Sequence, residues 1–204
     1  MFQKKLERSL KSRTYCINLD RRPDRWEKAQ KEFELIGITD VHRFSAIDAY
    51  DVKIKRSINK GETGCLLSHL DLIKAGKWFN LDYLIIFEDD VEFHPGFNKL
   101  FDLSLIPGDW DMIYFGGNDI HPATRINDRV SKLNCTYTTH AYMIRNTIFD
   151  KVIELIGPAE KQIDVYYADL HPTINAYGFR PKIAFQRECY SDIQNRSIKY
   201  KSLL

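Results

Sequence analysis

Three consecutive carboxylates, Glu88-Asp89-Asp90, are the residues of this 204-residue chain that most directly indicate a chemistry. They follow five apolar residues, 83–87, which predict a strand buried on both faces of a sheet. Adjacent carboxylates repel one another and lose solvation when buried. A hard divalent cation, Mn²⁺ or Mg²⁺, removes these costs and commonly shares its site with substrate phosphates. We therefore predict metal ligands here, with Glu88 and Asp90 on the same side if the strand continues; the alternative is a solvated acidic loop.

A second polar segment runs from Asn18 to Arg25, after the first apolar run. Its backbone groups and the carboxylate of Asp20 could bind a nucleoside. Arg21, Arg22 or Arg25 could pair with a phosphate, because a guanidinium matches the geometry of phosphate oxygens. The alternative for these arginines, and for Arg25 above all, is an exposed start of a helix.

Two glycine-containing segments could also contact a ligand. Gly61-Glu62-Thr63-Gly64 opens a predicted helix, whose N-terminal N–H groups would favour an anion. Ser68 and His69 follow one turn further along, although a lone histidine on a half-apolar helix is more often a core residue. Gly116-Gly117 follows a predicted buried strand and would let a sugar approach the backbone closely, unless the pair forms an ordinary turn.

Strands and helices that would position these groups alternate along the chain. Apolar runs predict strands at 14–19, 40–44, 83–87, 112–115 and 181–185, and an extended segment at 136–144. Apolar residues at helical spacing predict helices at 26–36, after Gly61, at 95–103, after Asn146 and at 164–176, where Pro172 would bend the helix. Residues 119–133 predict an irregular surface loop. The alternation predicts one α/β domain over residues 1–204, with its core at about 14–193 and a mainly parallel sheet flanked by helices.

Composition sets limits on partners and location. The chain has 30 basic and 28 acidic residues and no long basic tract, so we expect no nucleic acid partner. The modest positive stretch Lys53, Lys55, Arg56 and Lys60 could meet a phosphate or an anionic membrane, but a solvated loop is the simpler interpretation. Four widely spaced cysteines without a CxxC pattern indicate a reducing compartment. With a charged N-terminus and no apolar run of membrane-spanning length, we expect a cytoplasmic protein without signal peptide or transmembrane segment, at most peripheral to a membrane.

Five segments taken in order resemble glycosyltransferase family 25, over nearly the whole chain from Tyr15 to Asp192. They are Ile17 to Arg25, Gly61 to His69, Phe87-Glu88-Asp89-Asp90, Tyr114-Phe115-Gly116-Gly117 and Ser191-Asp192-Ile193. That family includes bacterial lipooligosaccharide galactosyltransferases and the galactosyltransferases that modify collagen hydroxylysine. The resemblance implies a single GT-A-like (Rossmann-type) domain, an inverting mechanism, a UDP-sugar donor (usually UDP-galactose) and manganese. The chain is short for the family, and its C-terminal half matches more loosely.

The resemblance also implies roles for residues. Glu88, Asp89 and Asp90 would hold the metal, and inversion needs a base beside the acceptor hydroxyl. Asp164 is the candidate base, since family members have an acidic residue at a similar point; the alternative is a helix cap. The residues that would bind the donor are Asn18, Asp20, Arg22, Asp48, Gly64, Ser68, Gly116, Gly117 and Asp192. Asp169 is the substitute for Asp164, and His140 and His171 are weaker options for facing the metal or phosphates.

The leading hypothesis is therefore a metal-dependent inverting glycosyltransferase. It would move a sugar, galactose in the first instance, from a nucleotide-sugar donor to a glycan, a glycolipid such as lipooligosaccharide, or a hydroxylysine-type glycoprotein acceptor. An alternative is a catalytically inactive GT-A-fold protein that binds a nucleotide sugar or a glycan. A third is a different α/β enzyme, either a nucleotidyltransferase or an aspartyl phosphatase, although the acidic run lacks the phosphatase threonine. No P-loop and no GxGxxG motif is present, which disfavours kinases and dinucleotide enzymes.

Overall fold

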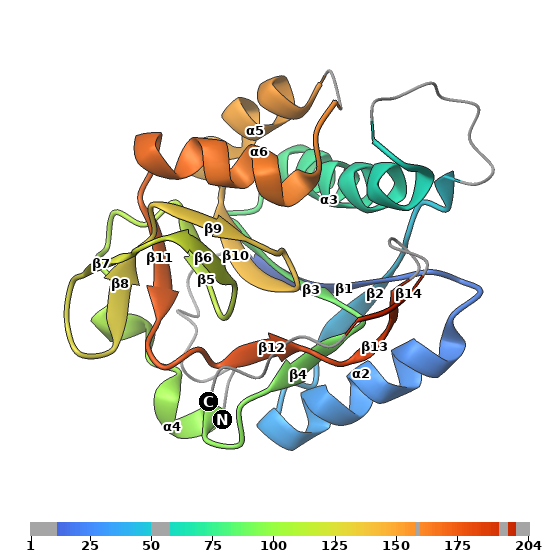
Figure 1. Cartoon of the computed structure of the whole chain (residues 1–204), viewed down its shortest axis with the longest axis horizontal. Helices are drawn as coiled ribbons and strands as arrows, with labels where there is room; N and C mark the ends of the chain where they lie inside the picture. Colours follow the sequence, from blue (N-terminus) through green and yellow to red (C-terminus); the bar gives the residue numbers. More distant parts are fainter. Residues whose placement is uncertain (1–11, 50–57, 158–159, 192–195, 199–204) are drawn as a thin grey trace.

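A computed structural model of the chain describes residues 12–49, 58–157, 160–191 and 196–198, so Asp192 and the stretch from Lys53 to Arg56 lie outside the described residues. The central sheet has eight strands, in the order β2-β1-β3-β10-β5-β11-β8-β7 (Figure 1). Along the chain these are β1 (Ser12–Asn18), β2 (Val41–Ser45), β3 (Tyr83–Glu88), β5 (Met112–Tyr114), β7 (Thr124–Arg125), β8 (Val130–Lys132), β10 (Ala141–Arg145) and β11 (Ala176–Phe179).

The sheet is mainly parallel, as predicted, in that all of its strands except β10 and β8 run in the same direction. β1 pairs in parallel with β2 and β3, and β5 pairs in parallel with β11. β10 is antiparallel to both its neighbours, β3 and β5, and β8 is antiparallel to β11 and β7. Because β10 runs against β3, the residues that precede β10 lie beside the carboxyl end of β3, where Glu88 ends the strand and Asp89 and Asp90 follow.

Three two-stranded sheets lie beside the central one. They are β12 (Ala184–Gln186) with β4 (Val91–Phe93), β13 (Cys189–Ser191) with β14 (Arg196–Ile198), and β6 (Asn118–His121) with β9 (Cys135–Tyr137). The helices are α2 (Pro23–Ile36), α3 (Lys60–Trp78), α4 (Phe97–Leu100), α5 (Phe149–Ile156) and α6 (Ile163–Leu170), with short 3₁₀ turns at Leu103–Leu105, Asn146–Ile148 and His171–Thr173.

Helices cover both faces of the sheet, and each face has its own core. Figure 1 shows α3, α5 and α6 together on one face and α2 on the other. Successive side chains of β3 alternate between the two cores: Ile85 and Phe87 pack with the α2 side, while Leu84 and Ile86 pack with the α3 side. The strand is therefore buried on both faces, as the apolar run predicted.

The ends of two helices have clear local causes. Pro23 occupies the first turn of α2, and Gly37 ends this helix with a left-handed φ of 76° that glycine adopts without strain. At the start of α3, Asn59 caps the helix and forms a capping box with Glu62. The helix thus begins slightly before the predicted Gly61.

Three predicted elements differ from the structure. Residues 119–133 are not an irregular loop, because they contribute to β6, β7 and β8. The extended segment at 136–144 is divided into β9 and β10. The predicted helix at 164–176 is wrong beyond Leu170: the chain turns at Pro172, and Ala176 begins the buried strand β11.

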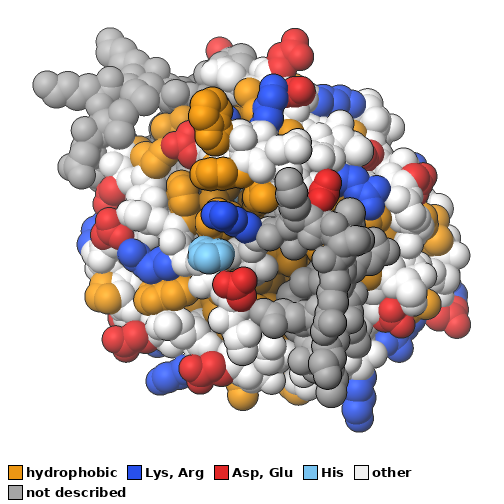
Figure 2. Space-filling model, turned by 180° about the vertical axis from the view of Figure 1, so that it is seen from behind, with side chains coloured by type: hydrophobic (Ala, Val, Ile, Leu, Met, Phe, Trp, Pro, Cys, Tyr) orange, Lys and Arg blue, Asp and Glu red, His pale blue; other side chains and the backbone are white. Residues whose placement is uncertain are grey.

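The surface agrees with the balanced composition. Figure 2 shows basic and acidic side chains interspersed over the described part of the face turned away in Figure 1, with hydrophobic side chains gathered near its middle. Among the described helices, none combines the length and the apolar character needed to span a membrane.

Candidate functional site

A cavity of about 370 Å³ lies at the carboxyl ends of β1 and β3, next to the N-terminal turns of α3 and α6. This is the edge of an α/β sheet at which ligands usually bind. The cavity brings together most of the predicted site residues. Those lining it are Asn18, Asp48, Gly64, Ser68, Glu88, Asp89, Asp90 and Asp164.

Glu88 ends β3 and is held from the β10 side. Its backbone N–H donates to the carbonyl of His140 (2.9 Å), and its Oε1 accepts from the hydroxyl of Thr139 (2.7 Å). The same Oε1 lies 3.4 Å from Nε2 of His69. Burial favours the protonated carboxyl, but the interactions with His69 and Thr139 outweigh it and lower the pKa of Glu88. Glu88 is therefore ionised at neutral pH.

Asp89 and Asp90 follow in a turn rather than continuing the strand, and both carboxylates pair with the guanidinium of Arg25. Arg25 Nη2 lies 2.5 Å from Asp89 Oδ1 and 3.1 Å from Asp90 Oδ2. Asp89 also accepts a 2.6 Å hydrogen bond from Asn18 Nδ2. Burial raises the pKa of Asp89 above its usual value. The carboxylate of Asp89 is thus occupied by two protein donors.

Asp90 keeps one carboxylate oxygen unused. Its Oδ1 is buried and has no hydrogen-bond partner in the described part of the chain. Burial and then the charge of Glu88 raise the pKa of Asp90 to about 7. A divalent cation fits such a site, because it would coordinate the free oxygen and offset the negative charge. The fit rests on Asp90 in the first place, since Glu88 and Asp89 already have protein partners.

Arg25 was expected on the surface, and this interpretation is wrong. Its side chain is only 11% exposed, because α2 begins at Pro23 and turns Arg25 inward against Asp89 and Asp90. The ion pairs explain why a guanidinium is tolerated there. Sequence spacing does not reveal this contact, which depends on how α2 packs against the end of β3.

The end of β1 and the segment after it are held by hydrogen bonds to side chains of β2 and to Asp89. Asn18 is fully buried, donates to Asp89 and to the carbonyl of Arg22 (2.9 Å), and accepts from Arg43 Nε (2.8 Å). Asp20 accepts from Arg43 (2.6 Å) and from the hydroxyl of Ser45 (2.7 Å). The hydrogen bonds from Ser45 and then Arg43 lower the pKa of Asp20.

Only some of the predicted donor-binding groups reach the cavity from this segment. Arg21 Nε lies 2.7 Å from Asp48 Oδ2, and both residues line the cavity. Asp20 is absent from the lining, and so is Arg22, which pairs with Asp24 (2.9 Å). Arg21 is therefore better placed than Arg22 to meet a phosphate in this cavity.

Gly64 and Ser68 hold the loop that carries Asp48. A Cβ atom on Gly64 would lie 2.3 Å from the carbonyl oxygen of Ile47, so α3 and this loop approach as closely as glycine permits. Ser68 Oγ accepts from the N–H of Ile47 (2.9 Å) and donates to the carbonyl of Gly64 (2.7 Å). Both residues therefore shape the cavity wall through the backbone of Ile47.

Gly116 and Gly117 lie at a second cavity, of about 540 Å³. A Cβ atom would lie 1.9 Å from the carbonyl oxygen of Ala184 at Gly116, and 2.6 Å from Cγ2 of Thr136 at Gly117. These glycines permit close packing against β12 and β9. The structure does not bring them to the first cavity, where the predicted metal residues lie.

The β6–β9 ribbon separates the two cavities. Asn118, Ile120 and Tyr137 line the first cavity, whereas Asp119 and Thr136 line the second. Neighbouring residues of a strand point to opposite faces, and here each face meets a different cavity.

Asp164 lies in the first turn of α6 and faces the first cavity. It accepts from the N–H of Thr138 (3.2 Å) and of Val165 (2.9 Å), and burial raises its pKa. Asp169 is exposed and pairs with Lys161 (2.8 Å).

Two histidines named as weaker candidates are buried away from the first cavity. His140 and His171 are absent from its lining, and burial lowers the pKa of each to about 4. Both are therefore neutral at physiological pH.

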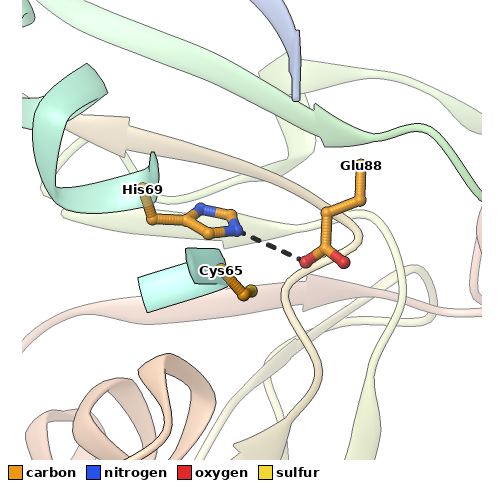
Figure 3. A group of neighbouring side chains, drawn as sticks. All are labelled: Cys65, His69 and Glu88. Carbon is orange, nitrogen blue, oxygen red and sulfur yellow. Dashed lines mark ion pairs between the residues drawn. The ribbon is translucent and has the colours of Figure 1, made fainter. Parts of the chain in front are cut away.

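Sequence reasoning gave no role to Cys65 and only a weak one to His69, yet both line the first cavity. Their spacing of four residues on α3 places them on one helical face, and Figure 3 shows both side chains beside Glu88. The spacing was visible in the sequence, but the partner from β3 was not.

Comparisons with known proteins agree with the resemblance seen in the sequence. Residues 11–115 match the sequence model of glycosyltransferase family 25, described as an LPS biosynthesis protein. A glycosyltransferase 25 family member of Anopheles gambiae is 29% identical over 79% of this chain and 32% of its own length. Procollagen galactosyltransferase 1-B of Xenopus laevis is 29% identical over 78% of this chain and 31% of its own. A Rattus norvegicus relative, 33% identical over 63% of this chain and 27% of its own, is named a probable inactive glycosyltransferase 25 family member 3.

Among solved structures, a Drosophila galactosyltransferase 7 variant in complex with manganese, UDP-Gal and xylobiose has a similar fold. It superposes with a TM-score of 0.50 over 95% of this chain and 78% of that chain, at 9% identity. The chain spans about a third of the length of the curated relatives it matches.

Proposed function

Because this chain belongs to glycosyltransferase family 25 and has a GT-A fold, we propose that it transfers a sugar from a UDP-sugar donor to an acceptor hydroxyl, with a divalent metal and with inversion at the anomeric carbon. Galactose is the sugar we test first, since the Xenopus relative is named a galactosyltransferase. The acceptor class we propose is a glycan, a lipooligosaccharide or a hydroxylysine-type residue.

The observation that carries this proposal is the free, buried oxygen of Asp90 in a cavity at the carboxyl end of β3. A carboxylate in such a place, with its pKa raised to about 7, is stabilised by a cation. Asp90 would hold Mn²⁺ or Mg²⁺ directly, and Glu88 would contribute its negative charge nearby. When bound, the cation supplies the positive charge that a departing UDP diphosphate needs.

The chain's own residues would do the remaining work. Arg25 holds Asp89 and Asp90 in place, and Asn18 fixes Asp89 from the β1 side. Arg21, which pairs with Asp48 on the cavity wall, would contact a donor phosphate.

Asp164 would accept the proton of the attacking hydroxyl. Its two backbone N–H donors fix the carboxylate, and burial raises its pKa, which strengthens it as a base.

A second candidate function is binding of a nucleotide sugar or glycan without catalysis. One structural observation favours it: Arg25 already lies against both Asp89 and Asp90, so the protein partly neutralises these carboxylates without a metal. The rat relative named as probably inactive shows that such a designation occurs among similar chains.

Donor hydrolysis separates these functions. We expect the metal-stripped protein to release galactose from UDP-galactose only after Mn²⁺ or Mg²⁺ is restored. Asp90→Asn should lower this rate by about 10²–10³-fold, the usual effect of losing one electrostatic contact in a transition state.

The matched control is Glu92→Gln, which removes a carboxylate from the exposed side of β4, two residues away. It should retain the wild-type rate. If UDP-galactose raises the melting temperature but no hydrolysis or transfer follows with any UDP-sugar, the binding function replaces the catalytic one.

A further inference from the structure

Cys65, His69 and Glu88 form a compact group of three different ligand types. Cys65 and His69 lie one turn apart on α3, and Glu88 comes from the end of β3. One ligand atom from each side chain lies within 4.8 Å of the other two. Figure 3 shows the histidine ring and the carboxylate directed toward one another, with the cysteine beside them.

The ring of His69 is bonded on one side and unsatisfied on the other. Nδ1 lies 2.8 Å from the hydroxyl of Tyr142, which lies 3.1 Å from that of Tyr167. Nε2, in a residue that is 0% exposed, has no hydrogen-bond partner within the described ranges, although Oε1 of Glu88 is 3.4 Å away. This arrangement is typical of a metal-binding histidine, whose second nitrogen is fixed by a hydrogen bond.

We propose that Cys65, His69 and Glu88 bind one Zn²⁺ ion, through Sγ, Nε2 and a carboxylate oxygen. Thiolate, imidazole and carboxylate are the ligands that zinc takes, whereas magnesium and manganese prefer oxygen alone. Zinc lies roughly 2.0–2.3 Å from such ligands, so the present spacing needs only small side-chain movements. All three residues line the first cavity, which leaves a fourth position open to water.

Binding changes the protonation of one ligand. Burial raises the pKa of the Cys65 thiol well above its usual range, so the metal-free thiol carries its proton. Zinc replaces that proton: the S–H bond breaks, a sulfur–zinc bond forms, and the proton passes to solvent. No oxidation or reduction is involved.

This site shares Glu88 with the proposed transferase site but rests on separate observations, made at Cys65 and His69. It includes Glu88 but neither Asp89 nor Asp90, and it selects a softer cation than the one proposed at Asp90. Its test needs no nucleotide, so it fails or succeeds separately from the transferase proposal.

Cobalt replaces zinc and reports its ligands by absorption. We expect the metal-stripped protein to take up one equivalent of Co²⁺ with a near-ultraviolet thiolate-to-metal band, and Zn²⁺ to abolish that band while Mg²⁺ leaves it. Cys65→Ser should lose the band. Cys135→Ser is the matched control, because Cys135 is a free thiol on β9 outside the group, and it should retain the band.

Two further variants test the histidine. His69→Gln should weaken Zn²⁺ binding, measured against a chromophoric chelator, by more than about 100-fold. Tyr142→Phe, which removes the partner of Nδ1, should weaken it by about 10–100-fold, as outer-shell changes do. Circular dichroism establishes that each variant is folded. Absence of a thiolate band in the wild type, or an unchanged band in folded Cys65→Ser, would overturn the proposal.

Discussion

Replacing Asp90 by asparagine should make the metal-free fold more stable at pH 8, even though it should also lower the proposed activity. Burial, and next the charge of Glu88, raises the pKa of Asp90 to about 7. An aspartate in an unfolded chain titrates at about 3.9. Ionised Asp90 therefore costs the native state about 4 kcal/mol, a value that follows from this difference in pKa.

The sign of the pH dependence follows from which state, unfolded or native, loses the Asp90 proton at the lower pH. Below about pH 4 the carboxyl is protonated in both states, and the fold has its full stability. Between about pH 4 and pH 7 the unfolded chain has released this proton while the native state keeps it, so stability falls as pH rises. The advantage of Asp90→Asn over the wild type should therefore grow by about 3 kcal/mol between pH 5 and pH 8.

Urea unfolding at these two pH values, followed by tryptophan fluorescence with EDTA present, measures that growth. With a denaturant slope of about 3 kcal/mol per molar, the difference between the midpoints of Asp90→Asn and wild type should increase by roughly 1 M. His140 and His171, whose pKa values burial lowers to about 4, affect both proteins alike and cancel in the difference.

Glu92→Gln serves again as the control and should track the wild type at both pH values, because its side chain is exposed. If the stability advantage of Asp90→Asn over the wild type is no larger at pH 8 than at pH 5, ionisation of Asp90 does not destabilise the native state. A cation at that oxygen would then relieve no electrostatic cost in the native state.

Two further outcomes test the geometry of the cavity. Asp164→Asn should lower the rate of sugar transfer by about 10²–10⁴-fold, whereas Asp169→Asn, one turn further on, should not, and equal effects would exclude Asp164 as the base. Gly64→Ala should destabilise the fold by about 1–3 kcal/mol in urea unfolding, because the new methyl group meets the Ile47 carbonyl at 2.3 Å. Gly108→Ala, where nothing lies within 4 Å, is its control, and a Gly64→Ala protein as stable as this control would contradict the close packing of α3 on the loop.

The central strand and the carboxylates after it were predictable because their signals are local. Apolar residues on both sides of β3 indicate two cores, and the side chains of Leu84 and Ile85 do enter different ones. The end of α2 at Gly37 was predictable from the local sequence in the same way, since a left-handed φ of 76° suits glycine. Family membership was also carried by short motifs.

Three short strands were not predictable from local patterns: β6, in the separate β6–β9 ribbon, and β8 and β11, on one side of the central sheet. All four residues of β6 are exposed, so this strand has no apolar alternation that would distinguish it from a loop. β8 pairs with β11, far along the chain, and β11 itself lay in a run whose spacing also suited a helix. Such strands form because a partner is present, and a partner cannot be read from the segment alone.

The candidate site was predictable in residue type but not in arrangement. The sequence placed three carboxylates at a strand end, yet it did not show that Arg25 would lie against two of them or that Glu88 would face His69. These contacts join α2, α3 and β3, so they arise only when the two layers of helices close over the sheet. The role of Asp192 stays a prediction.

Alternate residues along the β6–β9 ribbon line different cavities. Ile120 lines the first cavity, and its neighbour Asp119 lines the second. A substitution at either position therefore changes the lining of one cavity directly. Single substitutions in this ribbon, natural or engineered, can thus change the lining of either cavity separately.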